Sequence, residues 1–146
     1  MKRRKFVKLY KEHRIPIYRY IYFRVNSKEE AEDLASEVFL RVFNYFKKNQ
    51  PQNARAFFYK VARDLLVDFY RKNQRSLPEF ELKAEDKHFL DLYQALSGLN
   101  ADHREVVVLR YFEGFSIPEI AQITGKKEKN VEMMLYRSKN KLKDRL

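Results

Sequence analysis

One segment of this chain repeats apolar side chains at helical spacing without a break. From residue 31 to residue 46 these side chains are Ala31, Leu34, Ala35, Val38, Phe39, Val42, Phe43 and Phe46. Steps of three and four residues place all of them on one face of an α-helix. The 146 residues include only 3 glycines and 4 prolines, fewer than the turns of a β-rich fold require. We therefore expect an all-α protein.

Further helices flank this segment. A first helix is expected from about Phe6 toward Val25, with Pro16 breaking or kinking it. Ser27 is placed to cap the N-terminus of the helix that bears the apolar face. After that helix, the segment Lys47–Asn53 contains a proline and is expected to be a loop. A third helix is expected from Ala54 to Arg75. Its predicted core residues are Phe58, Val61, Ala62, Leu65 and Phe69.

Charge divides the chain into three parts. Residues 1–75 carry 19 basic and 8 acidic side chains, residues 76–92 carry 2 and 5, and residues 93–146 carry 10 and 7. The middle part has no clear period and is interpreted as a linker. The sequence thus predicts two small helical domains, 1–75 and 93–146, on a tether at 76–92.

The positive net charge of the whole chain favours a polyanionic partner. The net charge is +11, so nucleic acid is the first candidate, although a basic surface can also serve solubility or a membrane surface. Cysteine is absent and the three histidines, His13, His88 and His103, are far apart, so no metal or other cofactor is expected. No apolar run is long enough for a signal peptide or a membrane span, and a cytoplasmic protein without membrane insertion is expected.

The helix expected at 54–75 has a second face. Tyr59, Arg63, Val67 and Tyr70 follow at helical spacing, and basic side chains flank them. Cations interleaved with aromatic rings suit single-stranded nucleic acid, because phosphates meet the cations and bases stack on the rings. The alternative is that the tyrosines pack on neighbouring helices while the cations are solvated at the rim.

The C-terminal part has the spacing of a helix-turn-helix. Ser116 and Glu119 form a capping-box pattern, Gly125 allows a tight turn, and a second helix is expected from about Lys127 to Leu146. Its inner face is predicted to be Val131, Leu135, Ser138 and Leu142, and a preceding helix is expected at 102–112. This geometry presents a helix N-terminus to the DNA major groove, where asparagine reads adenine and lysine holds phosphate or guanine. The alternative is a helical hairpin that contacts protein.

Two stretches together resemble the sigma-70 superfamily of RNA polymerase sigma factors, in its small extracytoplasmic-function (ECF) type. The segment 31–41 (AEDLASEVFLR) and the segment 56–65 (AFFYKVARDL) are similar to regions of sigma domain two. The segment 99–146, which includes VVLRYFEGFS at 107–116, is similar to sigma domain four. The resemblance implies a protein that binds core RNA polymerase and directs promoter recognition and DNA opening, and that is not an enzyme.

The resemblance also implies roles for individual residues. The β′ coiled coil of polymerase would be bound by Asp33, Ser36, Glu37 and Arg41. The opened −10 strand would be bound by the loop and the third helix, at Lys47, Lys48, Asn49, Asn53, Arg55, Tyr59, Lys60, Arg63, Tyr70 and Arg71. The −35 duplex would be bound by Ser116, Lys126, Lys127, Lys129, Asn130 and Arg137, beside a contact with the β flap. An anti-sigma factor is a further candidate partner.

The sequence departs from the family pattern at several positions. Ser36 stands where glutamine is usual, Asp64 where asparagine is common, Glu132 where lysine is common and Met134 where arginine is common. These changes bear on promoter sequence and DNA affinity. Three other functions remain open: a stand-alone regulator of duplex DNA, a nuclease, and a sigma-like protein adapted to an anti-sigma or adaptor role. A nuclease would need convergent carboxylates or a histidine–metal cluster, and the sequence suggests neither.

Overall fold

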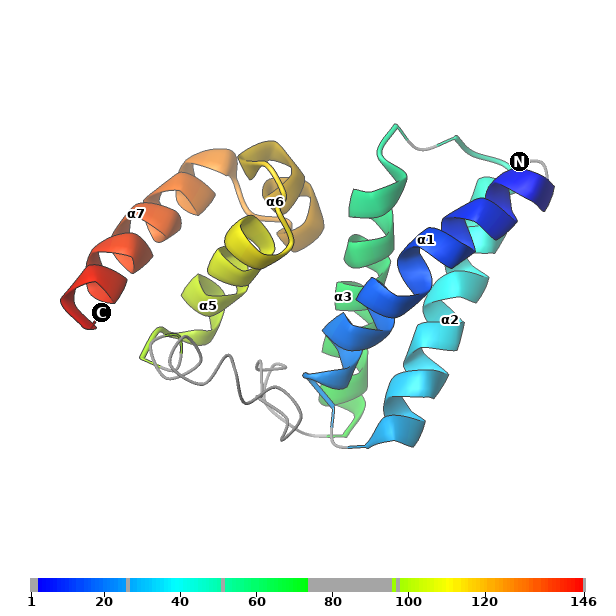
Figure 1. Ribbon diagram of the computed structural model, residues 1–146, viewed down its shortest axis with the longest axis horizontal. Helices are drawn as coiled ribbons and strands as arrows, with labels where there is room; N and C mark the ends of the chain where they lie inside the picture. The colour runs from blue at the N-terminus through cyan, green and yellow to red at the C-terminus, as the bar shows by residue number, and fades with distance from the viewer. Residues whose placement is uncertain (1–2, 26, 51, 74–95, 97, 146) are drawn as a thin grey trace. The chain divides into compact units, whose positions relative to one another are not determined.

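The computed structural model describes residues 3–25, 27–50, 52–73, 96 and 98–145. The chain divides into two compact units, residues 1–78 and 79–146. Every regular element in the described ranges is helical (Figure 1), so the predicted all-α class is confirmed. The predicted linker at 76–92 lies outside the described residues.

Unit 1 is a bundle of three helices, each packed on the other two. Helix α1 spans Arg3–Tyr22, α2 spans Lys28–Phe46 and α3 spans Ala54–Lys72. Ser27 and Asn53 cap α2 and α3, where their side-chain oxygens accept hydrogen bonds from the N–H groups of Glu30 and Ala56. The expected loop between α2 and α3 is present in the described part of 47–53.

The predicted apolar face of α2 is confirmed as the centre of this bundle. Ala31, Val38 and Val42 are fully buried, and Leu34 and Phe43 are half-buried at its edges. Aromatic rings fill the space between the helices: Phe39 meets Phe58 at 5.2 Å between centroids. Offset and edge-to-face pairs of this kind stabilise a core beyond the apolar area that they bury.

Two details of unit 1 differ from the expectation. The helix α1 continues through Pro16 and ends at Tyr22, so the predicted break is wrong. Proline in a helix interior costs about 3 kcal/mol, and the buried side chains on both sides of it, among them His13, Ile17 and Ile21, offset that cost. The helix α3 ends at Lys72, before Arg75.

The buried face of α3 includes Phe58, Ala62 and Leu65 as predicted, but the rest of it differs from the prediction. Val61 and Phe69 are half-buried, whereas Tyr59 and Leu66 are almost completely buried. The helix touches both α1 and α2, and therefore needs a wider apolar face than a single stripe provides.

Unit 2 contains α5 (Ala101–Val107), the π-helical turn η2 (Val108–Phe112), α6 (Ile117–Thr124) and α7 (Glu128–Arg145). The helix expected at 102–112 thus changes to π geometry halfway along. Four consecutive residues from Val106 to Leu109 are buried, which no single face of a regular α-helix allows. The wider turn and the contacts of α5 with α7 and of η2 with α6 accommodate them.

A candidate nucleic-acid and polymerase interface

The helix-turn-helix of unit 2 is built as the spacing predicts. Ser116 accepts a hydrogen bond from the Glu119 N–H, and the Glu119 carboxylate accepts one from the Ser116 N–H at 2.8 Å. Gly125 has φ of +76°, a left-handed conformation that ends α6 and turns the chain. Its N–H donates to the Ala121 carbonyl, so α6 is closed by its own backbone.

Helix α7 packs on this turn through the predicted inner face. Val131, Leu135 and Ser138 are buried and Leu142 is half-buried. With this face buried, the N-terminal end of α7 is directed toward solvent, and Lys127, Lys129 and Asn130 are exposed there. Arg137 is exposed two turns further along. These four side chains are available to a ligand that approaches the N-terminal half of α7.

Two other residues predicted at this site have structural contacts. The ammonium group of Lys126 lies 3.5 Å from the Asp102 carboxylate, and its side chain is only 22% exposed. It therefore points back to α5, because a carboxylate is within reach there. The side-chain oxygen of Ser116 accepts the hydrogen bond of the capping box and so stabilises the start of α6.

A second feature of the site is the outer face of α2. Asp33, Ser36 and Arg41 are exposed and Glu37 is half-exposed, all on the side away from the core. The guanidinium Nε of Arg41 donates to the Glu37 carboxylate at 3.1 Å. Leu40 lies among them and is 54% exposed. Sequence reasoning missed Leu40, although its position off the apolar stripe is a visible signal.

The face of α3 predicted to bind single-stranded DNA is only partly available. Tyr59 is 0% exposed and packs edge-on against Tyr20 at 5.2 Å, so its prediction as a base-stacking platform is wrong. A ring directed into the bundle cannot meet a base. Tyr70 is half-buried and its hydroxyl donates to the Arg24 carbonyl. For these tyrosines the alternative of packing on neighbouring helices holds.

Three cations of α3 form largely exposed ion pairs with carboxylates on the same helix, and such pairs hold the cations only weakly in water. Lys60 donates to Asp64 at 3.0 Å, so Asp64 is paired even though it replaces the usual asparagine. Arg71 and Lys72 both lie 3.1 Å from Asp68. Hydrogen bonds from Lys72 and then Arg71 lower the pKa of Asp68 below its ordinary value of 3.8. Arg63 is half-buried.

Some of the predicted residues in the loop and the first turn of α3 are available to a ligand, and others have structural partners. Lys48 is exposed, and Lys47 is exposed with its ammonium 4.8 Å from the centre of the Phe43 ring. Asn49 donates to the Tyr45 carbonyl and Asn53 caps α3, so both amides have structural partners. The guanidinium of Arg55 lies over the buried Tyr59 ring at 5.4 Å.

Within the described residues, no three histidine, cysteine or acidic side chains are grouped so that they could hold a metal ion. No helix in those ranges combines the length and apolar character that crossing a membrane requires.

Comparison with known proteins decides the family. Residues 9–76 match the model of sigma-70 region 2, and residues 89–142 match the model of sigma-70 region 4. The chain belongs to the sigma-70 family. Both regions occur in the expected order, which confirms the resemblance drawn from the sequence.

Similar curated proteins are ECF RNA polymerase sigma factors. BldN of Streptomyces coelicolor is 32% identical over 91% of this chain, which spans 57% of the length of BldN. SigX of Bacillus subtilis is 26% identical over 88% of this chain and 77% of its own length. This chain is accordingly a member of the ECF type of the sigma-70 family.

Solved structures agree on the fold. The sigma factor RpoE of Bartonella quintana, bound to the anti-sigma factor NepR, has a TM-score of 0.73 at 18% identity over 97% of this chain and 96% of its own. CnrH, in complex with the cytosolic domain of CnrY, has a TM-score of 0.72 at 23% identity over 98% of this chain and 88% of its own.

Proposed function

We propose that this sigma factor acts by binding alone, as a cytoplasmic protein that catalyses no reaction, and that its two units hold different parts of one promoter. Unit 1 docks on polymerase through α2 and binds the opened −10 strand, while unit 2 binds the −35 duplex. Residues 76–92 serve as the tether. The observation that carries this proposal is one chain with two separately packed units, one exposing an acidic helix face and the other an exposed basic helix N-terminus.

The docking surface consists of Asp33, Ser36, Glu37, Leu40 and Arg41. Their spacing places them side by side over two turns of α2, and the Glu37–Arg41 ion pair holds two of the side chains in a fixed arrangement. Leu40 gives this polar surface an apolar centre, and buried apolar anchors with a polar rim are the pattern of protein interfaces. We assign the β′ coiled coil of polymerase as its partner.

The strand-binding surface is basic and contains fewer available rings than the sequence suggested. Lys47 and Lys48 of the loop, with Lys60 and Arg71 of α3, supply cations to the phosphates of the opened non-template strand. Arg63 and the half-buried edge of Tyr70 complete this surface. Because Tyr59 is buried, binding depends on phosphate contacts and on base capture in the loop more than on stacking along α3.

The −35 surface is the first turn of α7. Lys127 and Lys129 contact phosphates or guanine, Asn130 reads adenine and Arg137 holds the backbone further along. The β flap contacts the same unit. An anti-sigma factor is a further proposed partner, because the structurally similar sigma factor RpoE of Bartonella quintana forms a complex with the anti-sigma factor NepR.

A stand-alone regulator of duplex DNA remains the second candidate function, favoured by the helix-turn-helix alone. It would give the exposed α2 face no partner. Capture of purified core polymerase by the full chain separates the two functions, since a stand-alone regulator does not bind core.

The charge-reversed variant Asp33→Lys/Glu37→Lys tests the docking surface. We expect it to lose core capture at least tenfold while its helical circular dichroism and melting temperature stay unchanged. The matched control is Glu12→Lys/Asp64→Lys, which makes the same change of charge at exposed positions on α1 and α3. Core capture that survives in the α2 variant, or that is lost equally in the control, contradicts the assignment.

A further inference from the structure

Helix α1 is the most basic of the helices that the structure describes, and it has no role in the proposed function. Helix α1 carries seven cations, at Arg3, Arg4, Lys5, Lys8, Lys11, Arg14 and Arg19, and one carboxylate, Glu12. All seven cations are exposed. Helix α2, which packs against it, has five acidic and two basic side chains. The two neighbouring helices of unit 1 thus present opposite charge to solvent.

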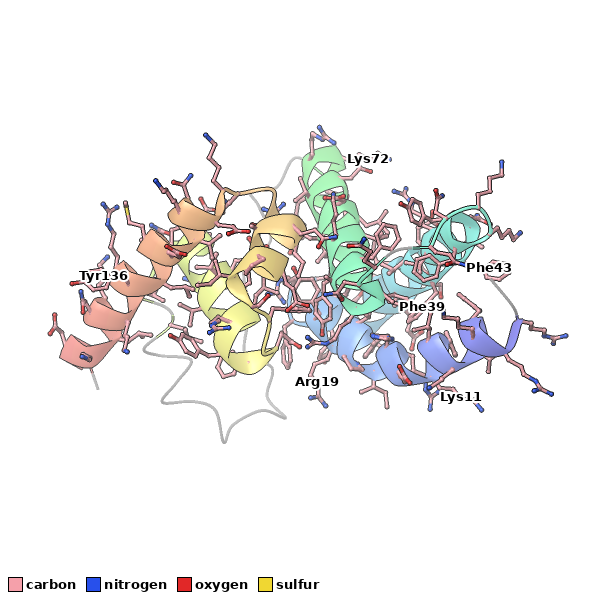
Figure 2. The ribbon with its side chains drawn as sticks, turned by 90° about the horizontal axis from the view of Figure 1, so that it is seen from above. Lys11, Arg19, Phe39, Phe43, Lys72 and Tyr136 are labelled. Carbon is pink, nitrogen blue, oxygen red and sulfur yellow. The ribbon has the colours of Figure 1, made fainter. Side chains whose placement is uncertain are left out.

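Four of these cations form one row, which we call the α1 stripe: Arg4, Lys8, Lys11 and Arg19. With the exposed Ile15 they follow at steps of four, three, four and four residues, which is one face of the helix. The row is about 22 Å long at 1.5 Å per residue. Figure 2 shows Lys11 and Arg19 on the side of α1 away from α3.

Little in the described residues neutralises the stripe. The one ion pair recorded on α1 joins Lys8 to Glu12 at 4.0 Å, with both side chains exposed. Such a pair contributes little in water, because solvent and salt screen it. The stripe is therefore an exposed positive surface.

The position of the cations also works against the helix that bears them. Arg3, Arg4 and Lys5 occupy the first turn, where the helix dipole is positive, and no acidic residue is present there. Arg4 and Lys8 are additionally like charges one turn apart. Each effect costs a few tenths of a kcal/mol. Repulsion of this kind, between cations and the helix dipole, is expected where a binding partner supplies the negative charge that the helix itself lacks.

We propose that the α1 stripe binds the phosphate backbone of duplex promoter DNA next to the opened segment. The inference rests on the proposed placement of opened DNA at unit 1, which brings duplex phosphates near this unit. Charge complementarity supports the choice of a polyanion. The exposed aliphatic residues beside the stripe are Val7 and Ile15, whereas the exposed ring of Tyr10 lies off the face of the stripe and packs edge-on against Phe39, with centroids 4.9 Å apart. Base stacking needs exposed rings, whereas cations on a rigid helix suit phosphates without reading sequence.

The nearby tyrosines do not change this assignment. Tyr18 and Tyr22 are half-buried at the end of the stripe, and their rings stack on each other with centroids 5.8 Å apart. Because each ring already stacks on the other, neither is a platform on which a base would stack. The α1 stripe should increase affinity equally for all promoters.

The test uses the holoenzyme formed from core polymerase and the full chain. In Arg4→Gln/Lys8→Gln/Lys11→Gln three backbone contacts are removed, and each contact contributes about 0.9 to the slope of log affinity against log salt. We expect that slope to become shallower by about 2–3 on a duplex promoter fragment, with equal loss on unrelated promoters. Core capture should be unchanged, and the melting temperature unchanged or slightly higher.

The matched control is Lys139→Gln/Lys141→Gln/Lys143→Gln, which removes three exposed cations from the C-terminal half of α7. It should change the slope by less than 1. An unchanged slope in the α1 variant, or a loss confined to single-stranded promoter DNA, overturns the proposal. Lost core capture also overturns it, because the stripe would then bind protein. Promoter-dependent initiation that persists with an unchanged slope overturns the α1 proposal alone and leaves the proposed function intact, which separates the two claims.

Discussion

The rings of Tyr20 on α1 and Tyr59 on α3 meet edge to face inside unit 1, with centroids 5.2 Å apart. Both side chains are almost completely buried, and the guanidinium of Arg24 lies 3.9 Å from the centre of the Tyr20 ring. This contact joins the first and third helices. It makes Tyr59 a residue of the core rather than of the DNA surface.

The replacement Tyr59→Ala should therefore destabilise unit 1. Truncation of a large buried aromatic ring costs about 3–5 kcal/mol, because apolar contacts are lost and a cavity remains. Urea unfolding followed by circular dichroism measures this change. Tyr59→Phe keeps the ring and should cost much less. If Tyr59→Ala unfolds at the same urea concentration as the parent and loses only open-complex formation, Tyr59 faces DNA after all.

Gly125 is the second position where a single replacement should act on the fold. Its φ of +76° is costly for residues with a Cβ, and an added Cβ would meet nothing within 4 Å, so the cost is conformational rather than steric crowding. Gly125→Ala should lower the stability of unit 2 by about 1–2 kcal/mol. Gly125→Asn should cost less, since asparagine tolerates this conformation better. Equal stability of all three proteins in thermal unfolding would contradict this account.

His103 on α5 should make the stability of unit 2 depend on pH. Burial first, and then the charges of Lys141 and Arg137, lower its pKa below the ordinary value of 6.5, while Asp102 opposes the shift. Its Nδ1 is buried and makes no hydrogen bond in the described residues. The unfolded chain therefore binds the proton more readily than the folded one. Stability should be fully present above pH 7 and fall as pH drops through 6.5 toward the lowered pKa.

The replacement His103→Gln isolates this effect, because glutamine does not titrate. The difference in melting temperature between pH 7.5 and pH 5.5 should be smaller in the variant than in the parent chain. His13 on α1 is replaced in the control, His13→Gln, which should leave the pH dependence of unit 2 unchanged. An identical pH profile for the parent and His103→Gln contradicts the assignment.

Lys127 and Asn130 test the DNA surface of α7. Both are exposed, so Lys127→Ala/Asn130→Ala should leave stability within about 0.5 kcal/mol. Loss of one base contact and one phosphate or guanine contact should reduce −35-dependent initiation at least tenfold, since each good base contact contributes about 1–3 kcal/mol. Transcription assays with core polymerase measure this loss. Lys126→Ala is the internal comparison, and its effect should be smaller because Lys126 pairs with Asp102.

The sequence predicted the parts of the fold that a regular period determines. The apolar spacing of α2 and the capping box and glycine of the helix-turn-helix depend on local rules, and each was found as expected. The buried face of α3 could not be predicted in the same way, because which of its apolar positions are covered depends on two partner helices. Tyr59 carries both an aromatic ring and a hydroxyl, so its type fits either a core or a DNA surface.

Other features depended on contacts that spacing does not reveal. The pairing of Lys126 with Asp102 joins residues 24 positions apart, and no local pattern indicates it. Leu40 is an exception, because its position outside the apolar stripe already indicates that it is exposed on the α2 surface. The π-helical turn at 108–112 arises from packing on both sides of α5 and η2, whereas the sequence there is typical of an ordinary helix.

We expect this chain to give core polymerase the ability to start transcription at promoters through two separate DNA contacts. Purified core enzyme, incubated with the full chain and a library of promoter fragments, provides the most direct measurement. We expect new transcripts from a subset of fragments that share two sequence elements, one for each unit, and none with the Asp33→Lys/Glu37→Lys variant. Core enzyme that neither binds the chain nor begins transcripts at new positions would contradict the account.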